Sequence, residues 1–574
     1  MRLSALRARG LTLACTAGVL LAACGSSSGT SQDLAGDQTF AFAIKDDVAH
    51  LDPADIDAAT DIPLLQNMFV GLYKFDDNLN IVPYGADGMP EISADSKTYT
   101  FHLQKNHQFS NGDKVTAKDW IYSWTRAAKH NASYEANLSP IVGADEVAAG
   151  TATTITGLSA KDDYTLVANL TNPAGYWLTQ LAMPTETEVV DSKVVDKAGD
   201  DKWTQDASTY IGSGPFKMTA RTPKQSMDFE PVSNWWGGST GKLTHVHIDI
   251  GLEDTARVKK FESGGYGAVG PANNAPGPDD VLRFQKDPTK KDLLHIYPGS
   301  RVTGLGFNFT QGPFAPGGKV EPGKSTVATP DAGLKGRQAI SLAIDRTQLA
   351  DVACVHAITC APATGGPIPK GVKGYLGDNA DQNATIDSNM AANVAKAKQL
   401  LEEWDPGKTK RNGIKLGYNT NDANNAIFGN VAAQLKANLG LDVSQDTRDF
   451  PTLLAERKQK TYTGLFRESW GMDYNHPQDW FDNLSICKQA IVGKGNNEGY
   501  CNPAMDTLVT AANKQPLDTA LPDYLKAGKI LVDDVVWVNL IYGTQPFMTQ
   551  KWVTGSSNNG FYDTEWSEIS ILKH

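Results

Sequence analysis

The apolar positions in the first part of the chain follow two different periods. Apolar and polar residues alternate at 40–44 and again at 99–103, and this period of two predicts β-strands. Residues 62–73 instead carry apolar side chains at helical spacing, and Gly71 is the expected end of that helix. Strands and helices therefore succeed each other from the start of the folded region.

A helix start is marked by the sequence Thr-Ala-Lys-Asp at residues 116–119. It has the pattern of a capping box, in which two side chains bond the backbone N–H groups of each other's residues, and Val115 and Trp120 are placed as its hydrophobic staple. Trp120 and Trp124 share a face of the helix that follows, because residues four apart are neighbours on a helix. We expect both rings to lie in the core.

The second half of the chain repeats a strand–helix–strand order. Strands are predicted at 414–420 and 441–445. One helix is predicted before them at 387–404, a second between the two strands, and a third after them at 451–459. The inward faces of the first two helices are predicted at Val394, Ala397, Leu401 and Trp404, and at Ala426, Val431, Leu435 and Leu439 with Gly440 as the C-cap. This alternation predicts an α/β lobe with a largely parallel sheet.

The length of 574 residues predicts two or three domains, because a single core does not grow to that size. A hydrophobic content of 40% and a charged content of 21% are ordinary for a folded globular protein. The net charge of −12 argues against nucleic acid and anionic membrane surfaces as partners.

The first 24 residues have the pattern of an export leader. Arginines at positions 2, 7 and 9 precede the apolar run 11–23, which is too short to span a membrane. The Leu-Ala-Ala-Cys junction resembles a bacterial lipoprotein cleavage box, which implies cleavage of residues 1–23 and lipidation of Cys24. Residues 24–33 then form a flexible tether rich in Gly, Ser and Thr. The alternative is plain secretion with Cys24 incidental.

Four cysteines remain after the leader and the lipidation site: Cys354, Cys360, Cys487 and Cys501. An oxidising compartment favours disulfides, and proximity in the sequence favours the pairs 354–360 and 487–501 among the three possible connectivities. None of the spacings is that of a zinc site, so we expect no metal.

The candidate chemistry is concentrated in residues 465–475. Arg467, Trp470 and Asp473 recur at three-residue spacing around a predicted strand that ends at Gly471, and ligands of α/β domains bind beyond such strand ends. A carboxylate at Asp473 with no fixed local cation, beside an aromatic wall, suits an ammonium group. The alternative is a solvated turn in which Asp473 caps its own backbone.

Three other motifs are interpreted as incidental. Residues 318–325 match the phosphate-binding P-loop, but no helix is predicted from Lys324 onward, and residues 25–29 match a hydrolase motif within the tether. His245 and His247 share one face of a strand without a third metal ligand, so we expect them to be surface or hydrogen-bonded histidines. No pair of carboxylates is placed for acid–base catalysis.

Several further motifs occur in one order along the chain. They are residues 109–124, 51–53, 212–216, 234–236, 343–346, 418–420, the stretch 465–475 and the carboxyl end 569–574. Together they resemble the extracytoplasmic solute-binding proteins of peptide ABC importers (family 5), and the last is similar to the oligopeptide-binding branch. The resemblance covers nearly everything after the tether.

This resemblance implies a periplasmic-binding-protein-like α/β fold with two main lobes joined by a hinge plus an additional domain. It places lobe I at 34–69, 191–300 and 544–574, lobe II at 70–190 and lobe III at 301–543. It also implies that an extended peptide lies between the lobes.

The resemblance also assigns candidate peptide-binding residues. The peptide amine falls to Asp473, with Trp470 and Arg467 beside it, and backbone pairing falls to Ser469, Gly471, Asp57 and Ala59, with Tyr134 as a further contact. Family members use a Lys and a His, besides the Arg, for the peptide carboxylate. Those two positions are Cys354 and Asn424 here, so the preferred peptide length is open.

The sequence therefore predicts a lipid-anchored receptor on the outer face of a bacterial cell membrane. By resemblance, it captures oligopeptides and passes them to the permease subunits of an ABC importer. We expect a monomer without cofactor or catalytic activity. The alternatives are the same fold binding a metal complex or an oligosaccharide, a peptide-signal receptor, and a secreted hydrolase.

Overall fold

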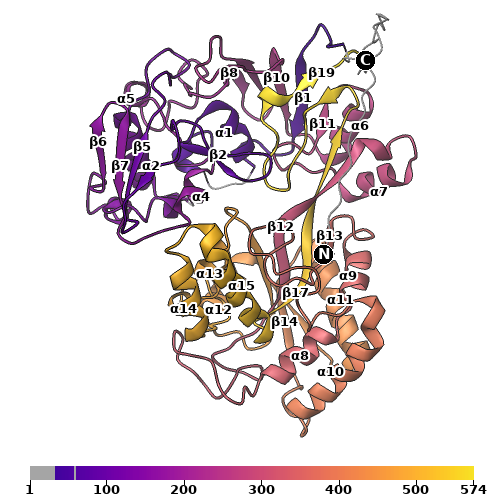
Figure 1. The fold of residues 1–574 in the computed structure, drawn as a ribbon. Coiled ribbons are helices and arrows are strands. Elements are labelled where there is room, and N and C mark those ends of the chain that lie inside the picture. The colour runs from indigo at the N-terminus through magenta and orange to yellow at the C-terminus, as the bar shows by residue number, and fades with distance from the viewer. Residues whose placement is uncertain (1–32, 49, 57–59, 133) are drawn as a thin grey trace, which may run out of the picture.

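The computed structural model describes residues 33–48, 50–56, 60–132 and 134–574. Figure 1 shows an upper and a lower body, and two long neighbouring strands run from one into the other. They are β12 (Leu294–Gly306) and β17 (Trp537–Thr549), which pair antiparallel with register shifts between Pro298 and Val302 and between Thr303 and Gly304. The two bodies are therefore joined through a two-stranded connection with irregular pairing.

The lower body is built on a mixed seven-stranded sheet in the order β11-β17-β12-β16-β14-β15, with β13 also paired to β17, and the edge strand β11 lies in the upper body. The remaining strands are β11 (Ala268–Val269), β13 (Cys360–Pro362), β14 (Lys415–Asn419), β15 (Ser444–Arg448) and β16 (Leu465–Gly471). Its helices are α8 (Leu334–Leu342), α9 (Arg346–Ala353), α10 (Met390–Trp404), α11 (Asp422–Leu439), α12 (Phe450–Lys458), α13 (Gln478–Leu484), α14 (Pro503–Ala512) and α15 (Leu517–Asp533). In Figure 1, α8 to α11 lie to one side of these strands and α13 to α15 to the other.

The upper body contains two four-stranded sheets. One has the order β1 (Thr39–Ile44), β10 (His245–Ile250), β9 (Ser226–Pro231) and β8 (Phe216–Thr222), and the other β4 (Glu91–Ile92), β5 (Thr98–His102), β7 (Thr165–Asn169) and β6 (Leu158–Asp162). Two small hairpins are β2 (Tyr73–Phe75) with β3 (Ile81–Pro83), and β18 (Val553–Thr554) with β19 (Ser570–Ile571). The helices are α1 (Ile62–Met68), α2 (Ala117–His130), α3 (Ala144–Ala148), α4 (Trp177–Leu181), α5 (Ser192–Ala198), α6 (Asp254–Glu262) and α7 (Pro278–Lys286).

The capping box and several predicted elements are confirmed. Thr116 and Asp119 form both reciprocal bonds at the start of α2, and Trp120 and Trp124 are fully buried. The strands predicted at 40–44, 99–103 and 414–420 and the helix at 451–459 correspond to β1, β5, β14 and α12. Local patterns were sufficient for β5 and α12 because each buries one face, whereas β14 buries three consecutive residues.

The helix predicted at 62–73 is too long, since α1 ends at Met68. The carbonyls that would have continued it are used by other segments: that of Met68 accepts from Gly214 N–H at 2.8 Å, and that of Val70 from Val189 N–H at 3.2 Å. These partners come from distant parts of the chain, so tertiary pairing overrides the helical pattern after Met68.

Three details of the second half also differ from expectation. The strand predicted at 441–445 begins only at Ser444, and Ala426 is exposed because α11 turns Ile427 and Phe428 inward. The sheet is parallel where β14 pairs with β15 and β16, but antiparallel where β12 pairs with β16 and β17. The βαβ prediction therefore holds for that part of the sheet, and the long connecting strands give the rest its opposite direction.

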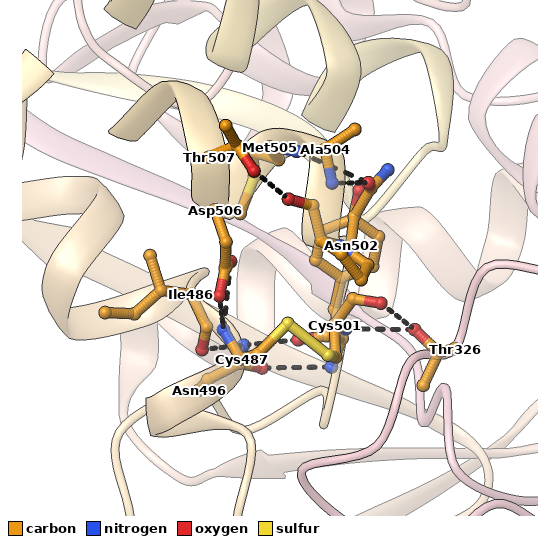
Figure 2. The surroundings of a disulfide bond; sticks show 12 residues. Thr326, Ile486, Cys487, Asn496, Cys501, Asn502, Ala504, Met505, Asp506 and Thr507 are labelled. Atoms are coloured by element: carbon orange, nitrogen blue, oxygen red, sulfur yellow. Dashed lines mark hydrogen bonds between the residues drawn. A yellow bond between two sulfur atoms is a disulfide. The ribbon is translucent and has the colours of Figure 1, made fainter. Parts of the chain in front are cut away.

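Both favoured disulfides are confirmed. Cys354 pairs with Cys360 and Cys487 with Cys501. Figure 2 shows the second one, where Cys501 N–H donates to Thr326 Oγ1 at 2.9 Å and Cys487 N–H donates to the Asp506 carboxylate at 3.1 Å. Closing a loop of this length contributes about 3 kcal/mol in the chain-entropy model, so the bridge fixes the segment between α13 and α14.

Several motif residues hold the fold rather than a ligand. Asp52 accepts hydrogen bonds from Arg126 Nη1 at 2.8 Å and Trp203 Nε1 at 2.7 Å. A Cβ on Gly212 would lie 1.9 Å from the Met68 carbonyl oxygen, so only glycine allows this approach. Arg346 is fully buried and donates to the Asn539 carbonyl at 2.6 Å. These residues join segments that are distant in sequence.

Candidate ligand site between the lobes

The candidate site lies at the end of β16, next to the connecting strand β12. The register places Gly471 opposite Arg301, Ser469 opposite Thr303 and Arg467 opposite Leu305. The pairing of β16 with β14 on its other side covers only Leu465 and Phe466. From residue 467 onward, β16 therefore has one edge that no strand of the described residues covers.

The backbone direction of β16 decides which groups face that open edge. Met472 N–H donates to the Ser300 carbonyl at 3.2 Å, so even-numbered residues point their backbone groups toward β12. The odd-numbered residues, including Ser469 and Gly471, point theirs outward. Ser469 N–H donates to the Glu468 carboxylate at 3.1 Å, while the Ser469 carbonyl and the backbone of Gly471 face the open edge.

Asp473 follows β16 by two residues and is half-buried. Burial raises the pKa of its carboxyl to about 6, and the positive charge of Arg301 partly opposes that rise. No described residue donates a hydrogen bond to the Asp473 carboxylate, so it does not cap its own backbone as in the alternative turn interpretation. The carboxylate is thus partly withdrawn from water without a close hydrogen-bonding partner.

Arg301 corrects the expectation that no fixed cation lies near Asp473. A Cβ added to Gly471 would lie 2.7 Å from a guanidinium nitrogen of Arg301, so the bare Gly471 backbone is what lets this side chain lie across the strand. Its Nη1 reaches Ser469 Oγ at 3.5 Å. Burial lowers the pKa of Arg301 and the charge of Asp473 raises it. Arg301 therefore supplies a positive charge beside Asp473, without a salt bridge to it.

A buried second carboxyl, Asp479 at the start of α13, positions the loop that carries Asp473. Its Oδ2 accepts from Asp473 N–H at 2.9 Å and from Trp470 Nε1 at 3.2 Å, and its Oδ1 accepts from Asn483 Nδ2 at 3.1 Å. Burial and the neighbouring charge of Asp473 hold the pKa of Asp479 well above its usual range. Asp479 therefore fixes both predicted site residues while Asp473 remains the group that ionises more readily.

Tyr134 and Tyr562 bring the upper body to the same place. Burial raises the pKa of the Tyr562 hydroxyl, and the charges of Tyr134 and Asp473 add to this rise, which places the three groups within electrostatic reach of one another. Both tyrosines pack against the core of the upper body. Asp473 from the lower body and two tyrosines from the upper body are thus close enough to influence one another electrostatically.

Arg467 is the second cation of the predicted site. It is half-buried, its guanidinium lies 6.0 Å from the Phe450 ring, and its buried Nε has no hydrogen-bond partner among the described residues. Burial lowers its pKa to about 10, with Glu468 opposing the decrease and Arg457 and Arg301 adding to it. A guanidinium with an unused donor suits a carboxylate ligand.

The two positions where the family has other cations are tied into the fold. Asn424 is buried at the start of α11, where its amide donates to the Asn419 carbonyl at 2.8 Å. Cys354 is buried in the core of the lower body and bonded to Cys360. Asp57, Ala59 and Cys24 lie outside the described residues.

The sequence pattern indicates Arg467, Trp470 and Asp473 as site residues. It does not indicate Arg301, Asp479 or Tyr562. Arg301 comes beside Asp473 only through the pairing of β12 with β16, and Tyr562 only through the packing of the carboxyl-terminal segment. Asp479 had a local signal, because it lies at the start of the helix that follows Asp473. The same stretch also contains the indole N–H donor of Trp470.

The discounted motifs are not assembled into sites. No helix follows Lys324 until α8 begins at Leu334. His245 and His247 both contact Asp228, at 3.0 and 2.7 Å, as expected for hydrogen-bonded histidines. Among the residues that the structure describes, no three His, Cys, Asp or Glu side chains are placed to hold a metal ion. In the same part of the chain, no helix has the length and apolar content needed to cross a membrane.

The fold and this site between two lobes define a solute-binding protein, and comparison with known proteins agrees. Residues 80–491 match the bacterial extracellular solute-binding proteins, family 5 (middle). The chain belongs to this family.

The chain is similar to oligopeptide-binding proteins over nearly the whole length of both chains. The oligopeptide-binding protein OppA of Bacillus subtilis is 27% identical over 569 residues, covering 94% of each chain. The periplasmic oligopeptide-binding protein OppA of Salmonella typhimurium is 27% identical over 579 residues, covering 97% of this chain and 98% of its own. The unliganded open form of MppA, a periplasmic murein tripeptide-binding protein, has a TM-score of 0.79 at 24% identity, covering 95% and 99% of the two chains. This last likeness establishes the two-lobed fold.

Proposed function

We propose that the protein is a receptor that binds peptides between its lobes and delivers them to an ABC importer. The observation that carries this proposal is Asp473, a half-buried carboxylate whose neighbouring cation, Arg301, does not hydrogen-bond it. The ammonium group of a peptide supplies the missing hydrogen-bond donors. The names of the related proteins, which bind oligopeptides, support the same ligand class.

The open edge of β16 gives the peptide backbone a partner. An extended peptide would accept from Gly471 N–H and donate to the Ser469 and Gly471 carbonyls, as in strand addition, with Asp57 and Ala59 on its other side. Trp470 and Tyr134 would line the site, and Arg467 would meet the peptide carboxylate, with Asn424 farther along. Pairing through the backbone accepts many sequences, which suits a receptor for uptake.

Closure around the ligand is proposed to occur at β12 and β17, where the pairing is irregular. The proposed boundaries are lobe I at 34–69, 191–300 and 544–574, lobe II at 70–190 and lobe III at 301–543. The buried clusters support them: Val302 and Tyr542 belong to the core of the lower body, whereas Phe547 belongs to the core around β1 and β10. Peptide would favour the closed arrangement by its greater affinity for it, and no reaction is catalysed.

The ligand class is tested by native mass spectrometry of the purified protein. We expect a bound mass that leaves on unfolding and fragments as one or more short peptides, because a closed cleft retains its ligand through purification. A metal complex or an oligosaccharide in that position would contradict the peptide assignment and support the other solute on the same fold.

The affinity for peptide is expected to depend on pH through Asp473. Its pKa of about 6 in the empty site falls when an ammonium group binds, so affinity is full above pH 7 and decreases by up to about tenfold per pH unit below 6. Calorimetric titration between pH 4.5 and 8 measures this dependence. A peptide with a blocked amine serves as the control, and an equal decrease for both peptides would show that another group is responsible.

Anchoring is proposed to occur through lipid on Cys24, followed by the tether 24–33, with the protein acting as a monomer beside its permease subunits. Cys24→Ser is therefore expected to move the protein from the membrane fraction to the soluble fraction or the medium, and fractionation with immunoblotting measures this. Unchanged membrane association of the variant would contradict lipid anchoring.

A further inference from the structure

A cavity of about 330 Å³ is lined in part by Tyr562, and Asp473 is not among its lining residues. One wall is formed by β2, β3 and residues 182–188, and the other by the carboxyl-terminal segment 559–568. Phe75 and Tyr562 stack at its border with ring centroids 5.5 Å apart and an interplanar angle of 17°. Tyr562 therefore links this cavity to the electrostatic surroundings of Asp473, the proposed site of the peptide amine.

The lining of this cavity is strongly acidic. Lys74 is the only cation in it, whereas the carboxylates are Asp76, Asp77, Glu188, Asp563, Glu565 and Glu568. Lys74 pairs with Glu565 at 2.6 Å, and the backbone N–H groups of Asn78 and Asn80 donate to Asp76 at 2.9 and 2.8 Å. These partners leave an excess of negative charge that nothing else in the lining compensates.

Glu188 shows independently that a binding partner is missing. Its side chain is only 2% exposed, it lines the cavity, and its Oε2 has no hydrogen-bond partner among the described residues. The Tyr84 hydroxyl in the same cavity is also buried and unpartnered. A buried polar group without a partner is costly, so such groups in a site usually meet a ligand or water.

The lining around Glu188 favours a cation over a neutral group, because five other carboxyl groups line the cavity with only one cation, Lys74. Burial and the neighbouring Glu186 hold the pKa of Glu188 well above its usual range. An arriving ammonium or guanidinium group would favour its ionised form and strengthen the contact. The rings of Tyr84 and Phe75 add cation–π attraction, as Lys74 already shows at 4.5 Å from the Tyr84 ring centroid.

We propose that this cavity binds the cationic side chain of a lysine or arginine near the amino terminus of the bound peptide, so that the receptor prefers basic peptides. This inference rests on the proposed function, because the peptide amine at Asp473 brings its first side chains to Tyr562. A cavity of this size accommodates a long side chain together with bound water.

The preference is tested with alanine tetrapeptides that carry lysine at the first, second or third position. Each is compared by calorimetry with a peptide that has norleucine, an uncharged residue of similar shape, at the same position. We expect lysine to bind at least about tenfold more tightly than norleucine at one of these positions, because a charge-assisted hydrogen bond forms in a partly dry cavity.

Two variants test whether the preference for lysine arises in this cavity or from the overall charge of the protein. Glu188→Gln is expected to reduce the preference to less than about threefold. Tyr84→Phe provides a second test that removes only a hydroxyl group.

The outcomes are distinct. Equal affinity for the lysine and norleucine peptides at all three positions would overturn the inference while leaving peptide binding intact. A preference that persists in Glu188→Gln and in Tyr84→Phe would place it outside this cavity. If no peptide binds at all, the proposed function fails, and this inference fails with it.

Discussion

Replacing Asp473 by asparagine is expected to weaken the binding of an unblocked peptide by about 2–5 kcal/mol. The variant keeps the shape of the side chain and a hydrogen-bond acceptor, but it leaves the peptide ammonium in a closed cleft without a compensating charge. The nearby cation Arg301 increases the loss, because its repulsion of the ammonium is no longer opposed. Calorimetric titration with a peptide identified by mass spectrometry measures the change.

Asp442→Asn is the matched control, because that side chain is 87% exposed on the loop after α11. We expect its affinity to equal that of the unmodified protein. Melting temperatures of both variants should stay close to the original, since the Asp473 carboxylate accepts no hydrogen bond from the described residues. Equal peptide affinity of Asp473→Asn and the unmodified protein would contradict the assignment of Asp473 as the amine site.

Replacing Arg126 by alanine is expected to lower the free energy of unfolding of the upper body by about 3–5 kcal/mol. Arg126 is 6% exposed and meets both oxygens of Asp52, which is 5% exposed. Removing one partner of a buried pair leaves the other charge without compensation. Denaturant unfolding followed by tryptophan fluorescence measures the change, because Trp203 donates to the same carboxylate at 2.7 Å.

An exposed ion pair gives the comparison for this effect. Arg283 pairs with Glu262 at 2.7 Å, and its side chain is 42% exposed. Arg283→Ala is expected to cost at most about 1 kcal/mol, since solvent screens such pairs. A similarly small loss for Arg126→Ala would show that the ion pair between α2 and Asp52 does not stabilise the upper body.

The sequence was sufficient where one segment determines its own structure. The capping box of α2 and the buried pair Trp120 and Trp124 depend on residues within one turn of each other, so the local pattern predicts them. The stretch that carries Arg467, Trp470 and Asp473 is also continuous, because β16 and the loop after it present all three.

Features formed by segments that are distant in sequence could not be predicted from the local pattern. Helix α1 ends early because Gly214 and Val189 take its carbonyls, and neither residue is near it in sequence. Arg301 lies beside Gly471 only through the register of β12 with β16, so the charge next to Asp473 was missed. The direction of β12 and β17 likewise depends on how the lobes are connected, which a strand–helix alternation does not encode.

The central claim, that Asp473 holds a peptide amine, is tested most directly by combining its substitution with acetylation of the peptide. Free and acetylated forms of one peptide are titrated against the unmodified protein and Asp473→Asn. The account predicts that acetylation costs about as much as the substitution in the unmodified protein and little more in the variant, because both changes remove one interaction. Losses that simply add, or acetylated peptide that binds as tightly as free peptide, would contradict it.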